Sequence, residues 1–118
     1  MKRRSFIRPM LASIVGAGLT VPALAADAYP TKPIKVIVPY AAGGVVDVQT
    51  RAVTESMAQF LKQPIIVEPR PGASGSIAAE AVARAEPDGY TLVVSASFFF
   101  TQPLLETNLR WSARQFTP

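Results

Sequence analysis

The sequence predicts an α/β domain whose strands lie parallel in one sheet. Three short runs of β-branched and apolar residues, at 34–38, 65–68 and 90–95, are separated by two stretches with helical periodicity. The connections are short, and strands joined through helices pair in parallel with right-handed crossovers. A glycine-bearing turn follows each of the first two strands. Both turns are therefore expected to open onto one crevice, at the carboxyl ends of the strands.

The first strand-helix unit begins with an extended segment. Two prolines keep residues 29–33 extended, and the β-branched run 34–38 is a buried-strand pattern that Pro39 ends. The glycine pair 43–44 then forms a turn, and a helix is predicted from residue 45 to about residue 61. Its predicted apolar face is Val45, Val48, Ala52, Val53, Met57, Phe60 and Leu61, and its predicted solvent face is Arg51, Glu55 and Gln59.

The second unit repeats this arrangement. A strand at 65–68 leads into the turn 70–76, and an alanine-rich helix is expected at 77–84 with Ser76 as its N-cap. A turn that contains proline and glycine then leads into the third strand, at 90–95. The order strand, helix, strand, helix, strand gives a parallel β-α-β-α-β sheet.

Beyond residue 95 the pattern is weaker. Phe98-Phe99-Phe100 is expected to pack in the core, with a surface that faces a missing partner as the alternative. Three strands and two helices cannot cover both faces of a sheet. One edge and one face are therefore expected to stay exposed unless more chain follows.

Residues 1–25 have the three parts of a cleavable export signal. A cationic start at 2–8 precedes an apolar stretch at 10–21 and the A-x-A site at 23–25. The stretch is too short to span a bilayer. The paired arginines leave two export routes open, the Sec route and the twin-arginine route. A mature chain of residues 26–118, with no lipid-accepting cysteine, is expected in the periplasm.

The composition excludes several classes of function. The net charge of +4 comes from the leader, because residues 26–118 hold eight basic and eight acidic side chains. No electrostatic footprint for nucleic acid is left in the folded part. The chain has no cysteine, which excludes disulfides and thiol chemistry. It also has no histidine, which removes the usual general base and the commonest zinc ligand.

Known catalytic and cofactor motifs are also missing. Neither turn supplies the lysine and hydroxyl of a P-loop, and the first turn lacks dinucleotide-binding spacing. Gly72-x-x-Gly75-x-x-Ala78, with Glu68 at a strand end, keeps dinucleotide binding as a minor alternative. Ser74 lacks the closing glycine of a nucleophile elbow and any histidine to activate it. No metal site, no cofactor and no catalytic residue are predicted.

The chemistry that remains is binding through the backbone. A helix start offers free N–H groups and a partial positive charge, so the two turns predict a cradle for a small carboxylate. A purely structural role for Gly43 and Gly44 is the alternative of equal weight. Asp47 is expected to bind amides of its own turn or to complement the helix dipole, because its charge would repel an anion. Arg70 is expected to face solvent or pair with a neighbouring acid. The hydroxyls at the same edge are those of Ser74, Ser76, Ser95 and Ser97.

Four motifs carry a family resemblance. They are Tyr29-Pro30-x-Lys32-Pro33-Ile34, Val38-Pro39-Tyr40-x-x-Gly43-Gly44-x-x-Asp47, Gln63-Pro64-Ile65-Ile66-Val67-Glu68-x-Arg70-Pro71-Gly72-Ala73-x-Gly75 and Pro87-Asp88-Gly89-Tyr90-Thr91-Leu92. In this order they resemble the periplasmic solute receptors of tripartite tricarboxylate transporters, the Bug family. The resemblance runs from Tyr29 to Pro118.

The resemblance implies a type II periplasmic binding fold, in which two α/β lobes close on a small carboxylate. The ligand would be a di- or tricarboxylate, an aromatic acid or an amino acid, delivered to membrane subunits of the transporter without covalent chemistry. Residues 26–118 would form an incomplete first lobe of a receptor that is monomeric at full length. The positions that the resemblance assigns to the ligand are Tyr40, Ala41, Gly43, Gly44, Asp47, Ala73, Ser74, Gly75, Ser76, Ser95 and Ser97.

The chain also departs from the family pattern. Val45 and Val46 stand where a hydroxyl often follows the glycine pair, and the three phenylalanines would make the crevice more apolar and favour an aromatic acid. The family runs to about 300 residues, two or three typical domain lengths. Two alternatives therefore stay open: a truncated chain without a competent site, and a small α/β enzyme.

Overall fold

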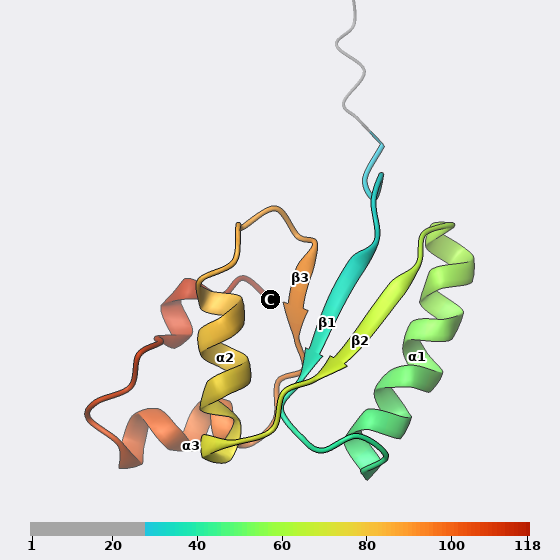
Figure 1. Ribbon diagram of the computed structural model, residues 1–118. Coiled ribbons are helices and arrows are strands. Elements are labelled where there is room, and N and C mark those ends of the chain that lie inside the picture. The colour runs from blue at the N-terminus through green and yellow to red at the C-terminus, as the bar shows by residue number, and fades with distance from the viewer. Residues whose placement is uncertain (1–27) are drawn as a thin grey trace, which may run out of the picture.

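Residues 28–118 are described by a computed structural model of the chain (Figure 1). The strands β1 (Ile34–Val38), β2 (Ile65–Pro69) and β3 (Thr91–Val93) form one parallel sheet in the order β2-β1-β3. The predicted parallel α/β sheet is therefore confirmed, with a third strand shorter than expected. The predicted export signal lies outside the described residues.

The strand register brings the carboxyl ends of the strands together. β1 pairs with β2 from Ile34 opposite Ile65 to Val38 opposite Pro69, and the three arrowheads in Figure 1 point to the same edge. β1 is central and nearly continuous in its burial, with Val38 fully buried. This burial explains the unbroken β-branched run, because a central parallel strand is covered on both faces.

Three helices and two short 3-10 turns connect and follow the strands. They are α1 (Val45–Leu61), η1 (Ala73–Gly75), α2 (Ser76–Ala83), α3 (Phe98–Leu105) and η2 (Ala113–Gln115). The predicted bounds of α1 are confirmed, and α2 begins one residue before its predicted start. α3 was not expected. Within the described part of the chain, none of the helices has the length and apolar character needed to cross a membrane.

The inward face of α1 differs from the predicted one. Its buried or half-buried positions are Val46, Asp47, Thr50, Thr54, Ala58 and Leu61. Of the predicted apolar stripe only Leu61 lies on this face, whereas Val45 is 74% exposed and Phe60 is 85% exposed. Thr50 and Thr54 donate their hydroxyls to carbonyls four and three residues earlier in the helix. Their polar atoms are thereby satisfied, and their methyl groups are left to pack.

Lys62 ends α1 in a conformation that lysine disfavours. It is the C-cap, with φ of 54° and ψ of 30°, a left-handed geometry in which glycine is the usual residue. We expect Lys62→Gly to raise the free energy of unfolding by about 1 kcal/mol, because glycine has no Cβ to clash in the left-handed conformation. The greater conformational freedom of glycine in the unfolded chain offsets only part of this gain. Urea unfolding measures the change. Lys62→Ala is the control, and equal stabilisation by both variants would contradict the backbone explanation.

A cluster of aromatic side chains forms the core beneath α3. Phe98 and Trp111 are each 5% exposed, and Phe99 stacks on Trp111 with ring centroids 5.1 Å apart. Phe116 closes the cluster, 5.0 Å from the ring of Phe99. The core-packing expectation is confirmed for Phe98 and Phe99. It is wrong for Phe100, which is 72% exposed because the helix turns it away from the cluster.

Candidate functional site

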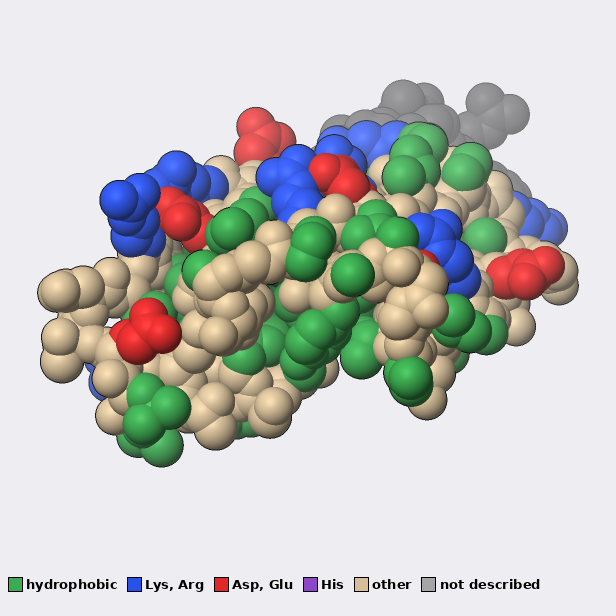
Figure 2. Space-filling view, turned by 60° about the horizontal axis from the view of Figure 1, so that its bottom comes forward, with side chains coloured by type: hydrophobic (Ala, Val, Ile, Leu, Met, Phe, Trp, Pro, Cys, Tyr) green, Lys and Arg blue, Asp and Glu red, His purple; other side chains and the backbone are tan. Residues whose placement is uncertain are grey.

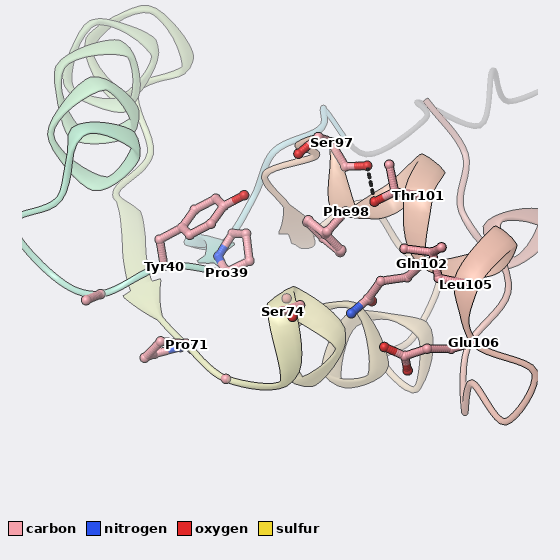
Figure 3. Close-up of a pocket in the computed structure, with 13 residues that line it drawn as sticks. Pro39, Tyr40, Pro71, Ser74, Ser97, Phe98, Thr101, Gln102, Leu105 and Glu106 are labelled. Carbon is pink, nitrogen blue, oxygen red and sulfur yellow. Dashed lines mark hydrogen bonds between the residues drawn. The ribbon is translucent and has the colours of Figure 1, made fainter.

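A cavity of about 550 Å³ lies at the carboxyl edge of the sheet (Figure 3). Three segments line it: residues 39–41 after β1, residues 71, 72, 74 and 75 after β2, and one face of α3 with the residues that flank the helix. Figure 3 shows Pro39 and Tyr40 on one side, Phe98 and Gln102 on the other, and Ser74 between them at the base. The two turns converge because their strands are parallel neighbours in register.

Five of the eleven predicted site residues line this cavity. They are Tyr40, Ala41, Ser74, Gly75 and Ser97. Each of the three strand ends thus contributes at least one predicted residue. Among the described residues, no hydrogen bond engages the hydroxyls of Tyr40, Ser74 or Ser97.

The other six predicted residues do not line the cavity. They are Gly43, Gly44, Asp47, Ala73, Ser76 and Ser95. Ser95 lines a different, more apolar cavity of about 840 Å³ beside β3 and the last described residues. Gly43 and Gly44 shape the first turn without reaching the cavity.

Asp47 organises the first turn from within. Its Oδ2 accepts hydrogen bonds from the Gly43 N–H and from Arg51 Nε, both at 2.9 Å, and its side chain is almost fully buried. The expectation that Asp47 binds an amide of its own turn is confirmed. The hydrogen bond from Arg51, followed by that from Gly43, lowers the pKa of Asp47 below its ordinary value.

The lowered pKa of Asp47 predicts a dependence of stability on pH. A carboxyl whose pKa is lower in the folded state stabilises the fold above its unfolded pKa, about 3.9, and this contribution is lost as the pH falls through the folded value. We expect wild-type protein to lose stability below about pH 4 more steeply than Asp47→Asn does. Urea unfolding between about pH 2 and pH 7 measures both profiles. Glu55→Gln, an exposed change on α1, is the control, and parallel wild-type and Asp47→Asn curves would exclude this role.

The second turn has an unusual backbone. Four successive residues have positive φ: Gly72 (125°), Ala73 (45°), Ser74 (50°) and Gly75 (97°). Ala73 and Ser74 are not glycine, so this left-handed conformation costs each of them roughly 1–2 kcal/mol. Gly75 N–H closes the turn on Gly72 O at 3.0 Å. Among the described residues, the N–H groups of Ala73 and Ser74 donate no hydrogen bond, so both are free to bind an anion.

Ser76 does not cap α2 as predicted. The N-cap is Gly75, and no side chain accepts a hydrogen bond there. The Ser76 hydroxyl instead donates to Gln102 Oε1 at 2.6 Å and accepts from Trp111 Nε1 at 3.1 Å. The Ser76 hydroxyl is thus hydrogen-bonded to side chains 26 and 35 residues away, and it does not cap the helix.

α3 supplies cavity residues that the sequence did not indicate. Thr101, Gln102, Leu105 and Glu106 line the cavity together with Phe98. The Thr101 hydroxyl donates to Ser97 O at 3.1 Å, the dashed line in Figure 3. The only sequence signal that could have placed these residues was the position of Ser97 after the third strand. A helix containing three aromatics and Pro103 has little local propensity to reveal it.

The cavity lining carries no basic side chain. Of its residues only Glu106 is charged. Arg70, at the edge of the second turn, is paired with Glu68 at 2.6 Å, as expected for an arginine beside an acid. Figure 2 brings this edge forward and shows mainly hydrophobic and uncharged atoms there, with charged side chains mostly around the rim. An anion bound here would be held by neutral donors.

Other site chemistry finds little support in the described residues. No group of three potential metal ligands occurs among residues 28–118. Glu68, considered above as a ribose ligand, has its carboxylate occupied by Arg70 and by Lys35 at 3.3 Å. These two cations, Arg70 first, lower the pKa of Glu68 and keep it ionised. Dinucleotide binding at this strand end is correspondingly disfavoured.

Comparison with known proteins identifies relatives of this chain. The tripartite tricarboxylate transporter family receptor matches residues 49–118. A UPF0065 protein of Bordetella bronchiseptica is 44% identical over 109 residues, which cover 92% of this chain and 32% of that protein. The solved structure of the periplasmic binding protein BugD is 40% identical with a TM-score of 0.68, covering 72% of this chain and 28% of BugD.

A second solved relative holds a ligand. MatC from Rhodopseudomonas palustris, solved with bound malate, is 38% identical with a TM-score of 0.66, covering 76% of this chain and 31% of MatC. The chain thus spans about a third of the length of the relatives it matches. Since the family match covers more than half of the chain and agrees with the fold, the protein belongs to the tripartite tricarboxylate transporter receptor family.

Proposed function

We propose that this chain supplies one half of the carboxylate site of a periplasmic solute receptor. The observation that carries the proposal is the cavity between two turns with free amides and hydroxyls and no basic side chain. The Ser74 N–H group and the hydroxyls of Ser74 and Ser97, which line the cavity, would donate to the carboxylate oxygens. The partial positive charge at the start of α2, whose N-cap Gly75 lines the cavity, would add to the binding energy.

The receptor would work by closure around its solute. The described residues cover one side of the cavity, and a second lobe, within the length that relatives have beyond this chain, would cover the other. The export signal would bring the receptor to the periplasm, where a monomer would pass its solute to membrane subunits of the transporter. Binding without covalent chemistry needs no cofactor, and the neutral donors of the cavity suit that role.

The solute would be a small carboxylate. The malate-bound relative supports a short dicarboxylate as the first candidate, and an aromatic acid or an amino acid remains compatible with the cavity. Of the three phenylalanines only Phe98 lines the cavity, so the apolar contribution is smaller than the sequence implied. Aromatic acids are therefore the weaker candidates.

The test uses the whole product of the reading frame that encodes this chain, without its leader. Malate, succinate, adipate, benzoate and aspartate are compared by thermal shift and calorimetry, with malamide as the uncharged analogue of malate. At a hundredfold excess over Kd, one acid should stabilise the fold by about 2.7 kcal/mol, and malamide should not. No stabilisation by any acid would argue against a carboxylate receptor.

A matched pair of serine variants ties binding to the cavity. We expect Ser74→Ala to weaken binding of the best acid by about tenfold, because a hydrogen bond to a charged group is lost. Ser56→Ala, at an exposed position on α1, should leave the affinity unchanged. Equal affinities for the two variants would place the solute elsewhere.

A chain with half a site and weak binding is the second candidate. This chain spans about a third of the length of its relatives, so a protein that ended at Pro118 would have one side of the cavity alone. Reading the DNA on both sides of the coding segment distinguishes the two. An in-frame continuation supports the receptor, and a stop codon directly after Pro118 supports the half-site.

A further inference from the structure

Gln102 connects α3 to the second turn. Its side chain is 4% exposed, and Figure 3 shows its amide nitrogen directed toward the turn that carries Ser74. Gln102 Nε2 donates to Ala73 O at 2.9 Å, across 29 residues of sequence. Because a buried amide must be hydrogen-bonded, both ends of the Gln102 side chain are committed to partners.

The proton positions in this network have only one consistent arrangement. Trp111 Nε1 can only donate, so the Ser76 oxygen accepts from it at 3.1 Å. The Ala73 carbonyl oxygen can only accept, so the Gln102 amide nitrogen is the end that faces it. Gln102 Oε1 then faces Ser76, and the Ser76 hydroxyl donates to it at 2.6 Å. Each polar side-chain atom of Ser76, Gln102 and Trp111 thus has a hydrogen-bond partner.

The strained backbone of the second turn must be stabilised by contacts from outside the turn. Ala73 and Ser74 are adjacent non-glycine residues with positive φ, an unfavourable conformation that persists only when surrounding structure enforces it. Within residues 28–118, the hydrogen bond from Gln102 is the only one that a side chain makes to residues 72–75. It therefore holds the peptide that joins Ala73 to Ser74, the unit whose N–H would face the solute.

We infer that Gln102 is the positioning residue of the carboxylate site: its amide fixes the left-handed second turn and thereby sets the affinity for the solute. The inference rests on the proposed function. It predicts that solute affinity depends on the Gln102 donor more strongly than global stability does. A purely structural role would lower affinity and stability in proportion.

The test compares Gln102→Leu with Trp111→Phe in the whole product of the reading frame. Leucine fills the position with an apolar side chain and removes both the donor to Ala73 and the acceptor of the Ser76 hydroxyl. Phenylalanine at 111 keeps an aromatic ring, removes the outermost hydrogen bond of the network and loses some core packing, while the Gln102 donor to Ala73 is kept. Malate affinity is measured by calorimetry and unfolding by urea. We expect Gln102→Leu to lose at least tenfold in affinity, and Trp111→Phe to stay within twofold of wild type despite lower stability.

Amide hydrogen exchange without solute gives an independent readout. The N–H groups of Gly75 and Ser76 close the turn on Gly72 O and Ala73 O. They should exchange at least tenfold faster in Gln102→Leu than in Trp111→Phe. If Gln102→Leu does not fold, Gln102→Met replaces it, because the methionine sulfur can accept weakly from Ser76 but cannot donate to Ala73. The same acceleration is expected.

The outcomes separate this inference from the proposed function. Wild-type protein that binds malate, with Gln102→Leu within twofold of it, would overturn the positioning role alone. Affinities that fall in proportion to stability in both variants would overturn it as well. Wild-type protein that binds none of the tested acids would overturn the proposed function and this inference with it.

Discussion

Replacing Gly75 with alanine is expected to destabilise the fold by about 2–4 kcal/mol, through left-handed strain and overpacking together. Gly75 has φ of 97°, and a Cβ there would lie 2.7 Å from Phe98 Cγ and 2.9 Å from both Cδ atoms. The ring of Phe98 is buried in the aromatic cluster, so it has little space into which it could move. Urea unfolding measures the loss, a large share of the roughly 5–15 kcal/mol of a typical domain.

Gly43 provides the matched control. It has φ of 79°, but a Cβ added there would meet no atom within 4 Å. Gly43→Ala should therefore cost only the backbone strain, about 1–2 kcal/mol. The difference between the two variants isolates the contact with Phe98. Equal losses at both positions would show that the ring gives way and that the close approach of turn and core is unimportant.

Replacing Phe98 with alanine is expected to cost about 3–5 kcal/mol, because a large buried ring is lost and a cavity remains. Phe98 meets the rings of Phe99 and Trp111 edge-on at 6.1 and 6.2 Å. Its ring also packs directly against the backbone of Gly75. Phe100→Ala on the same helix is the control. Its ring is 72% exposed, so we expect a change within about 0.5 kcal/mol.

The two predictions are linked by a double-mutant cycle. Once Phe98 is alanine, the Cβ of an alanine at position 75 has room, so the double variant should lose less than the two single variants combined. A coupling of about 1–2 kcal/mol is expected for such contacting residues. Strict additivity would show that the turn and the aromatic core are independent. It would also weaken the case that α3 shapes the second turn.

The strand and helix pattern near the amino end could be predicted because its signals are local. Pro39 ends the first strand, and the periodicity that begins at Val45 gives the bounds of α1. The face that α1 turns inward could not be predicted. Thr50 and Thr54 satisfy their hydroxyls on their own helix. In contrast, the side chains of Val45, Val53 and Phe60 are exposed. A hydrophobic stripe identifies a helix without showing what covers it.

The site was only partly predictable for a similar reason. Tyr40 and Ser74 reach the cavity because each belongs to a turn whose place is set by its own strand. Ser76 follows the same turn, but distant side chains occupy its hydroxyl. Gln102 enters from a helix that no local pattern announced. The resemblance to the receptor family named residues in three segments that line the cavity, and it could not say which residues of each segment face it.

The sequence by itself determined the order of strands and helices, the parallel sheet, the two glycine-bearing turns and the family, because these depend on residues close together in the chain. Only the tertiary structure decided which donors remain free. That outcome depends on competition: Ser76, Gln102 and Trp111 satisfy one another across 26 to 35 residues of sequence, and the amides of Ala73 and Ser74 donate no hydrogen bond within residues 28–118. A hydrogen bond between distant side chains leaves no trace in local pattern, so its effect on the site appears only once the chain is folded.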